Sequence, residues 1–316
     1  MAVLVTGGAG YIGSHVARLL GEEAIIVDDF STGLESRVAG LICEHLNLAA
    51  ADATAKLEAL MRSHGVTAVV HLAARKKVGE SVELPEWYYS QNIGGMANLL
   101  TAMKNAGVNK LVFSSSAATY GVPNVDLVAE DLRCEPINPY GETKLIGEWM
   151  ARDAAKAWGL RHVNLRYFNV AGAGWPELAD TAVANLIPIV FDALKAGKKP
   201  QVFGDHYPTP DGSCIRDYVH VLDLAKAHIA ALDYLDSDNR EHTTFNVGSG
   251  SGSSVFEVLD VIRHVTGENF DAEILPGRAG DPPRLCADVS RIGKTLGWKT
   301  EADLTEIVRS AWAAIS

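Results

Sequence analysis

The chain has 316 residues, of which 47% are hydrophobic and 21% charged, a globular composition long enough to bury a substantial core. Its formal net charge of −11 argues against a nucleic-acid or anionic-membrane surface, because neutralising phosphates takes clustered Lys and Arg, and no basic run exceeds the triplet 75–77. No signal-peptide pattern and no run of about 20 apolar residues occurs, so we expect a cytoplasmic protein without a membrane span.

The first half of the chain alternates apolar runs of strand length with segments of helical period. This alternation is typical of βαβ units and predicts the α/β class, with a doubly wound parallel sheet of the Rossmann type. The predicted strands are 3–6, 24–28, 68–72, 110–115 and 162–168. The predicted helices are 13–20, 54–63, 85–105 and 139–158.

The rhythm changes after residue 169, where Gly, Pro and Asp become frequent and the elements become shorter. We therefore predict an NAD-binding Rossmann domain over 1–170 that also includes 215–247, with returns to the main sheet at 218–235 and 244–248. Residues 171–214 and 248–316 are predicted to form a smaller, partly discontinuous substrate-binding lobe.

A glycine-rich turn follows the first predicted strand, where residues 7–13 read GGAGYIG. Glycine at this spacing permits a tight turn and close approach to a pyrophosphate, which the N-terminus of the next helix stabilises. The second strand ends in Asp28 and Asp29, where a carboxylate can bond the adenosine ribose and repel a 2′-phosphate. Each feature alone is also explained by an ordinary loop, but together they predict a site for NAD rather than NADP.

A Tyr/Lys pair follows a predicted helix start, with Asn138 as N-cap and Pro139 at the first helical position. Tyr140 and Lys144 are four residues apart and share a helix face. A nearby ammonium and the positive charge of NAD⁺ both favour the phenolate, so the Tyr can remove a hydroxyl proton as hydride leaves the same carbon. By itself this spacing is common, and a solvated helix face is the more frequent explanation.

A hydroxyl-rich segment, 113–121 (FSSSAATYG), leaves the fourth predicted strand at its carboxyl end, where ligands bind in open α/β sheets. Ser116 is placed to hydrogen-bond the reacting hydroxyl and orient it between Tyr140 and the nicotinamide. The alternative is a Ser-rich loop that satisfies its own backbone. The neighbouring Tyr/Lys pair favours the catalytic interpretation.

With these motifs in order, the sequence resembles the extended short-chain dehydrogenase/reductase family over essentially its whole length, and within it the UDP-glucose 4-epimerases. The most specific segments are 76–81 (KKVGES), 166–169 (RYFN), 203–212 (FGDHYPTPDG) and 215–221 (IRDYVHV). The resemblance implies an isomerase of galactose metabolism that interconverts UDP-galactose and UDP-glucose. It also implies that NAD stays tightly bound and is regenerated in each turnover.

The resemblance carries roles onto matching positions of this chain. It implies that the catalytic residues are Ser116, Tyr140 and Lys144. It implies NAD contacts from Gly7, Gly10, Tyr11, Ile12, Gly13, Asp28, Asp29, Ser31, Thr32, Gly33, Asn47, Leu48, Leu72, Ala73, Ala74, Lys76, Asn92, Ser114, Tyr140, Lys144 and Phe168. It implies UDP-hexose contacts from Lys76, Ser116, Tyr140, Phe168, Asn169, Asn185, Leu186, Gln201, Val202, Phe203, Arg216, Arg278, Asp281 and Leu285.

The sequence departs from the family pattern at several of these positions. Asn47 stands where the family usually offers an Asp to the adenine, and Ala118 and Thr119 stand where Thr and Val are usual. Leu285 stands where some members have a bulky Tyr that closes the pocket against an N-acetyl group. We therefore expect UDP-N-acetylhexosamines to fit as well.

Other functions fit the sequence less well. A sugar-nucleotide 4,6-dehydratase would need an acidic pair after the serine, where this chain has Ala117 and Ala118. A uronate epimerase or decarboxylase matches 203–221 less closely, and a non-catalytic NAD-binding sensor has no need for a base beside the nicotinamide. No metal site is expected, because the four cysteines lie far apart without a Cys-x-x-Cys: Cys43, Cys134, Cys214 and Cys286.

Two further expectations concern apolar surfaces. The helices that begin at Pro85 and Pro139 carry apolar residues on more than one face, including Trp87 and Trp149. One face should pack on the sheet and another could form a homodimer contact, with burial inside the monomer as the alternative. His71, inside an apolar strand, is expected to be a core residue rather than a catalytic one.

Overall fold

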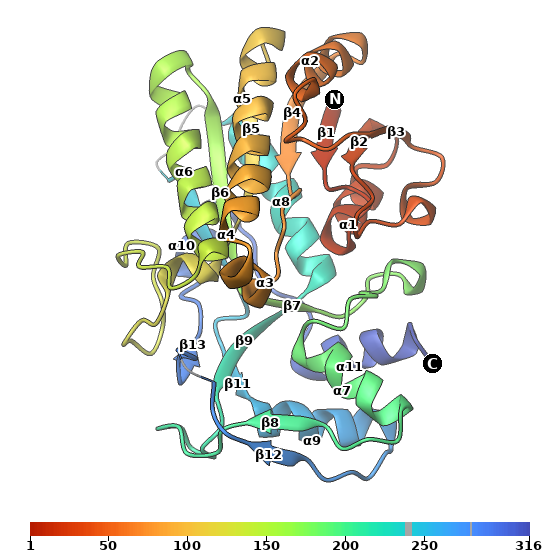
Figure 1. Cartoon of the computed structure of the whole chain (residues 1–316), viewed down its shortest axis with the longest axis vertical. Helices are drawn as coiled ribbons and strands as arrows, with labels where there is room; N and C mark the ends of the chain where they lie inside the picture. Colours follow the sequence, from red (N-terminus) through yellow and green to blue (C-terminus); the bar gives the residue numbers. More distant parts are fainter. Residues whose placement is uncertain (238–241, 279) are drawn as a thin grey trace. The chain divides into compact units, whose positions relative to one another are not determined.

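The computed structural model describes residues 1–237, 242–278 and 280–316 (Figure 1). Clustering of contacts divides the chain into two compact units. Unit 1 comprises 1–120, 134–166 and 225–245, and unit 2 comprises 121–133, 167–224 and 246–316.

The centre of unit 1 is a sheet that, in the described residues, has seven strands in the order β10-β6-β5-β4-β1-β2-β3. The pairs β1–β2, β1–β4, β2–β3 and β4–β5 are all parallel. The strands are β1 (Ala2–Thr6), β2 (Ala24–Asp28), β3 (Ile42–His45), β4 (Val66–His71), β5 (Lys110–Ser116), β6 (Arg161–Tyr167) and β10 (Thr244–Val247). This arrangement confirms the predicted doubly wound α/β class.

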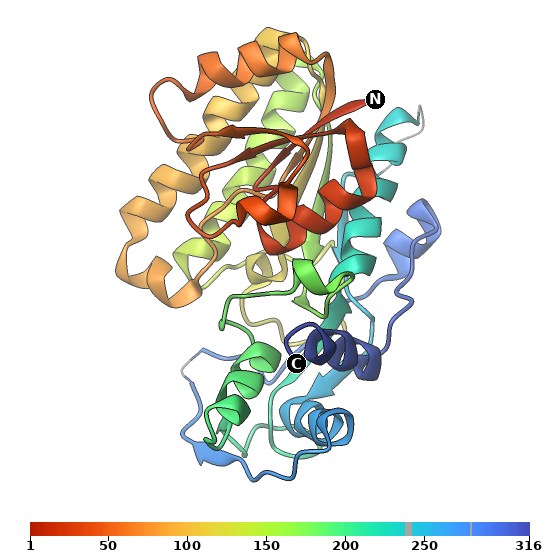
Figure 2. The same ribbon diagram turned by 90° about the vertical axis from the view of Figure 1, so that its right-hand side faces the viewer.

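Helices cover both faces of this sheet, with α5 and α6 on one side and α8 on the other (Figure 2). The helices are α1 (Tyr11–Leu20), α2 (Ala53–Ser63), α3 (Val78–Glu83), α4 (Pro85–Tyr88), α5 (Gly95–Ala106), α6 (Pro139–Trp158) and α8 (Val221–Asp236). Short segments complete the unit: η1 (Gly21–Glu23), η2 (Glu35–Val38), η3 (Tyr89–Gly94) and η4 (Ala117–Tyr120). Because both faces are covered, consecutive strand residues such as Val3, Leu4 and Val5 are all fully buried.

The predicted strands and helices of this part occur within two residues of their expected ends, with two differences. The edge strand β3 was not predicted, because its side chains are mostly exposed and it lacks an apolar run. The predicted helix 85–105 is interrupted by η3, a π-helical turn that carries Asn92. Such turns are often found at functional sites.

Unit 2 is built around β9 (Ile215–His220), which pairs antiparallel with β11 (Gly252–Ser254) and parallel with β13 (Arg284–Leu285) and β7 (Asn169–Ala171). A second small sheet pairs β8 (Gln201–Phe203) with β12 (Glu273–Leu275). The remaining elements are η5 (Pro176–Leu178), α7 (Leu186–Lys195), α9 (Val255–Thr266), α10 (Ser290–Leu296) and α11 (Leu304–Ala313). Their core includes Phe191, Val258 and Ile307.

One of the two expected returns to the main sheet differs from the prediction. The return at 244–248 occurs as β10, beside β6. Of the segment 218–235, residues 225–235 belong to unit 1 as part of α8, but Tyr218 lies on β9 of the four-stranded sheet, where it is buried with Val258 and Ile262 in the core of unit 2. Among the described residues, no helix combines the length and apolarity that a membrane span requires.

A buried ion pair ties α6 to β6 inside unit 1. The Arg166 guanidinium contacts both carboxylate oxygens of Glu148, at 2.8 Å from Nε and 2.6 Å from Nη2, and the two side chains are 7% and 6% exposed. Arg166 also donates to the Tyr120 hydroxyl at 3.0 Å, and Ser115 donates to Glu148 at 2.5 Å. The pair thus holds together the segments on either side of Ser116.

Replacing Arg166 by Met should lower the free energy of unfolding by about 3–5 kcal/mol, because Glu148 would remain buried without its partner. Arg152→Met on α6, the helix that carries Glu148, is the matched control. Its ion pair with Asp153 is 53% and 62% exposed, so its loss should cost about 0–1 kcal/mol. Denaturant titration followed by circular dichroism measures both variants. Equal losses would contradict a special role for the buried pair.

Candidate functional site

The glycine-rich turn between β1 and α1 is closely packed against the loop that follows β4. A Cβ on Gly7, whose φ is 72°, would lie 2.7 Å from the Ala73 nitrogen, and a Cβ on Gly13 would lie 2.1 Å from the Gly7 oxygen. Helix α1 begins at Tyr11, with Gly10 as an N-cap that supplies no side-chain cap and with no acidic residue in the first turn. The helix N-terminus is therefore suited to an anionic group such as a pyrophosphate.

Asp28, at the end of β2, connects this turn to the loop that follows β2. Its carboxylate accepts from the Ala9 N–H at 3.0 Å and from the Phe30 N–H at 2.9 Å. Burial raises the pKa of Asp28, and these two hydrogen bonds act against that rise. Gly33 lies so close that an added Cβ would be 2.8 Å from the Asp28 carboxylate. The residues present thus fit the adenosine half of a dinucleotide, with a carboxylate available for ribose hydroxyls.

The loops after β2 and β4 lie on either side of the glycine-rich turn, because the strand order is β4-β1-β2. These loops hold eight of the predicted cofactor residues: Asp29, Ser31, Thr32, Gly33, Leu72, Ala73, Ala74 and Lys76. The N–H groups of Leu72 and Ala73 both donate to the Thr6 oxygen at 3.0 Å. The sheet therefore brings these sequence-distant residues together at one edge.

Asn92 organises the loop that carries Lys76. Its Oδ1 accepts from the Arg75 N–H at 2.8 Å, and its Nδ2 donates to the Arg75 oxygen and to the Thr143 hydroxyl, both at 3.0 Å. Asn47 has its Oδ1 bonded to the Ala49 N–H at 2.8 Å. The amide oxygen predicted to replace the usual adenine contact is thus already engaged within its own turn.

Ser116, Tyr140 and Lys144 lie buried at the junction of β5 and α6. The predicted N-cap is confirmed, since Asn138 Oδ1 accepts from the Gly141 N–H at 2.9 Å and Pro139 opens the helix. Lys144 Nζ donates to the Ser114 oxygen at 2.8 Å and lies 5.9 Å from the centre of the Tyr140 ring. The three predicted catalytic side chains therefore belong to one buried cluster.

Burial dominates the electrostatics of this cluster. It raises the pKa of Tyr140, against a hydrogen bond with Ser116 that lowers it, and it lowers the pKa of Lys144 to about 8. Tyr140 is therefore neutral in the protein alone, whereas Lys144 still carries its charge at neutral pH, so a proton-accepting Tyr140 requires further positive charge nearby. The oxidised nicotinamide would supply that charge.

His71 was expected to be a core residue, and the structure confirms this. Its Nδ1 lies 2.6 Å from the Thr6 hydroxyl and its ring stacks on Phe113. Burial, with a smaller contribution from Lys144, lowers the pKa of His71 to about 3. His71 is therefore neutral across the physiological pH range.

Unit 2 contains most of the residues that the resemblance assigns to the sugar nucleotide. Arg216 on β9 donates to the Pro282 oxygen at 2.7 Å and forms a 3.4 Å ion pair with Asp281. Leu285 is the register partner of Arg216 on β13. The Arg278 guanidinium lies 3.8 Å from the centre of the Phe203 ring, a cation–π contact at the end of β8.

The other predicted substrate residues occupy element ends in the same unit. Asn185 is the N-cap residue of α7 and Leu186 its first residue, while Asn169 pairs with Tyr218 across β7 and β9. Phe168 and Val202 are buried.

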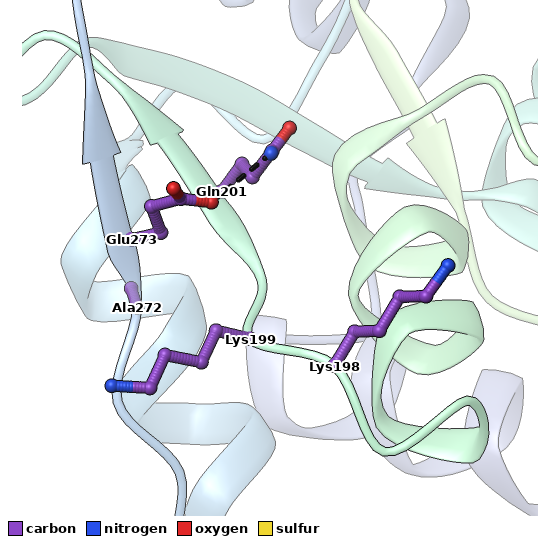
Figure 3. A pocket seen from close by; sticks show the side chains of 5 residues that line it. All are labelled: Lys198, Lys199, Gln201, Ala272 and Glu273. Carbon is purple, nitrogen blue, oxygen red and sulfur yellow. Dashed lines mark hydrogen bonds between the residues drawn. The ribbon is translucent and has the colours of Figure 1, made fainter.

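Gln201 lines an open cavity of about 530 Å³ whose other lining residues are Lys198, Lys199, Ala272 and Glu273 (Figure 3). Gln201 donates to Glu273 at 3.2 Å. None of these five belongs to the cluster of Ser116, Tyr140 and Lys144, and the cavity lies along β8, β12 and the residues that precede them. Within the described part of the chain, no group of three or more His, Cys, Asp or Glu residues could hold a metal ion.

Sequence reasoning missed two structural features of the site. Arg75 was noted only as part of a basic triplet, yet it bonds the loop after β2 through Asp29. The Glu148–Arg166 pair supports the segments around Ser116 from behind. The sequence offered two signals of these features: a charged residue at the end of an apolar strand, and a charged residue on the buried face of a helix.

Comparison with known proteins gives consistent results. Residues 3–248 match the model of the NAD dependent epimerase/dehydratase family. The UDP-glucose 4-epimerase of Corynebacterium glutamicum is 44% identical over 323 residues, covering 100% of this chain and 96% of that protein.

Two solved structures show the same fold. The UDP-glucose 4-epimerase of Stenotrophomonas maltophila, with bound NAD and formylated UDP-arabinopyranose, has a TM-score of 0.93 and 40% identity, covering 99% of this chain and 97% of that one. The UDP-Glc/GlcNAc 4-epimerase of Campylobacter jejuni has a TM-score of 0.85 and 39% identity, covering 99% and 98%. With identity at this level over the full length and a family match across most of it, the chain belongs to the NAD dependent epimerase/dehydratase family.

Proposed function

We propose that this chain interconverts UDP-galactose and UDP-glucose by reversible oxidation at C4 of the sugar, with NAD as its resident cofactor. The observation that carries the proposal is the buried cluster of Ser116, Tyr140 and Lys144 in the same unit as a glycine-rich turn that fits a dinucleotide. A binding protein would have no use for a base, an ammonium and a hydroxyl donor in that arrangement. The similarity to UDP-glucose 4-epimerases over the whole chain supports the choice of substrate.

In this mechanism, Tyr140 accepts the proton of the 4-hydroxyl while Ser116 holds that oxygen by a hydrogen bond. Bound NAD supplies the reversible hydride acceptor. The ammonium of Lys144 stabilises the phenolate form of Tyr140 by its charge. After the 4-keto sugar turns its other face, Tyr140 returns the proton to the oxygen, and the configuration at C4 is inverted with no net redox change.

We assign the nucleotide half of the substrate to residues of unit 2. Arg216 and Arg278 carry the fork-shaped cations that suit a diphosphate, and Phe203 offers an aromatic ring for the uracil. Asp281 is a carboxylate suited to ribose hydroxyls. Firm binding through the UDP group would leave the hexose free to rotate, as the inversion requires.

Incubating purified protein with UDP-galactose and no added NAD should produce UDP-glucose, observed by NMR. Tyr140→Phe should reduce the rate by about 10²–10⁴-fold, because it removes the proton acceptor. Tyr234→Phe is a matched control that loses a 3.3 Å hydrogen bond from the His242 N–H and should keep the wild-type rate.

A different substrate result would revise the proposal in a defined way. Turnover of UDP-uronates but not of UDP-galactose would keep the chemistry and change the sugar. No reaction with any sugar nucleotide, even with NAD supplied, would favour the NAD-binding sensor.

We further propose that UDP-N-acetylhexosamines are substrates. Leu285 is only partly buried on β13, beside Arg216, and a leucine leaves more room there than the Tyr of some family members. One relative of this fold is a UDP-Glc/GlcNAc 4-epimerase, so the family scaffold supports both reactions in that protein.

Leu285→Tyr should reduce turnover of UDP-N-acetylglucosamine by about tenfold or more while keeping that of UDP-glucose, because filling the space penalises the bulkier sugar by about 1–3 kcal/mol. Leu127→Tyr, at an exposed position of unit 2, is the control. Steady-state kinetics with both sugars measure the ratio. If wild-type protein turns over neither N-acetyl sugar, the proposal fails.

We also propose a homodimer formed through α3, α4 and α6, which pack against one another in unit 1. Their outer surface exposes apolar side chains, including Val82 at 62% and Trp149 at 46%. The other large apolar residues there are Val78, Leu84 and Trp87, whereas Tyr88, Met96, Leu99 and Leu100 of the same predicted helix are buried. Contiguous exposed apolar surface is typical of subunit interfaces.

Sedimentation velocity should show a dimer for wild-type protein and a monomer for Trp149→Glu, because a charge at a buried interface position is strongly unfavourable. Leu19→Glu, at an exposed position on α1, should remain dimeric. A wild-type monomer at all concentrations would exclude this interface.

A further inference from the structure

Arg75 links the loops that follow β4 and β2, on either side of β1. It lies in the loop after β4, and its Nη2 is 2.5 Å from the Asp29 carboxylate in the loop after β2. Its Nη1 donates to the Ser31 hydroxyl. Because β1 lies between β4 and β2, this side chain links the two loops that flank the strand from which the glycine-rich turn leaves.

Contacts with other residues fix both the backbone and the side chain of Arg75. The side-chain amide of Asn92 bonds the Arg75 N–H and its carbonyl oxygen, at 2.8 and 3.0 Å. The guanidinium lies 5.0 Å from the centre of the Trp87 ring. The side chains of Arg75 and Asp29 are 18% and 24% exposed. Fully exposed ion pairs contribute little to stability, because forming them requires ordering two otherwise mobile side chains. The pair of Arg75 and Asp29 differs from them because it is mostly buried.

Asp29 is also fixed. Its Oδ1 accepts from the Ser31 N–H at 3.0 Å and from the Ser31 hydroxyl at 2.5 Å. Burial alone would raise the pKa of Asp29, but the Ser31 hydrogen bonds and the charge of Arg75 outweigh it and hold that pKa below its ordinary value. Asp29 is therefore ionised, and paired with Arg75, at neutral pH.

We propose that Arg75, Asp29 and Ser31 form a clasp across the dinucleotide turn, and that this clasp slows the release of bound NAD. The inference rests on the NAD site of the proposed function but not on the identity of the sugar. In a reaction with no net redox change, the same cofactor molecule must stay bound between the two hydride transfers. Its loss at that point would leave the sugar oxidised. Opening the clasp requires separating a partly buried ion pair.

The test measures how fast NAD leaves the protein when no sugar nucleotide is present. NAD-loaded protein is mixed with excess isotopically labelled NAD, and the exchange of the retained cofactor is followed by mass spectrometry after rapid desalting. Arg75→Ala should exchange about tenfold faster or more. Asp29→Asn, which keeps an oxygen for Ser31 but removes the charge, should do the same.

The double variant should be little faster than either single one, because both substitutions break the same interaction. Added salt should accelerate exchange in the wild type more than in Arg75→Ala. Arg152→Ala removes the same charge at an exposed site on α6 and should exchange like the wild type.

Two results would overturn the clasp. One is an unchanged exchange rate in Arg75→Ala. The other is faster exchange in Arg75→Ala but not in Asp29→Asn, which would mean that Arg75 acts on the dinucleotide directly. Circular dichroism identifies a variant that fails to fold, and Ser31→Ala, with a smaller expected acceleration, then takes its place. A wild type that retains no NAD would instead count against the proposed cofactor.

Discussion

The backbone of Gly7 passes so close to Ala73 that a methyl group on Gly7 would lie 2.7 Å from the Ala73 nitrogen. On the other side, the Gly7 N–H donates to the Val27 oxygen at 2.7 Å. These contacts join the carboxyl ends of β4, β1 and β2 into one continuous edge. This edge positions Asp28, Arg75 and the start of α1, because parallel neighbouring strands end side by side.

The proposed catalytic residues Ser116, Tyr140 and Lys144 lie where burial disfavours charged groups. Burial raises the pKa of Tyr140 and lowers that of Lys144 to about 8, and Lys144 bonds a backbone carbonyl rather than a carboxylate. The negative charge nearest in sequence on the buried face of α6, Glu148, is already neutralised by Arg166. The positive charge of a bound cofactor would therefore act on Tyr140 without competition from an unpaired buried carboxylate.

In unit 2, two neighbouring residues of β9 have different roles: Arg216 is proposed to bind the substrate, and Asp217 holds backbone segments in place. Arg216 and Asp217 are neighbours on β9 and so point to opposite faces. Asp217 is buried and accepts from the Ser249 N–H at 2.6 Å and the Ala287 N–H at 3.0 Å, which fixes the segments that flank β11 and β13. Because β13 carries Leu285, this buried carboxylate also sets the position of a residue assigned to substrate selection.

The sequence by itself determined the features that depend on near neighbours: the apolar strands, the glycine-rich turn, the Asn138 cap and the shared face of Tyr140 and Lys144. Each is set by steric and hydrogen-bonding preferences that act within about one helical turn. Only the tertiary structure placed β9 in the four-stranded sheet of unit 2 and paired Arg75 with Asp29, 46 residues away. Such pairings, and the pKa shifts of Tyr140, Lys144 and His71, depend on strand order and burial, which no local pattern encodes.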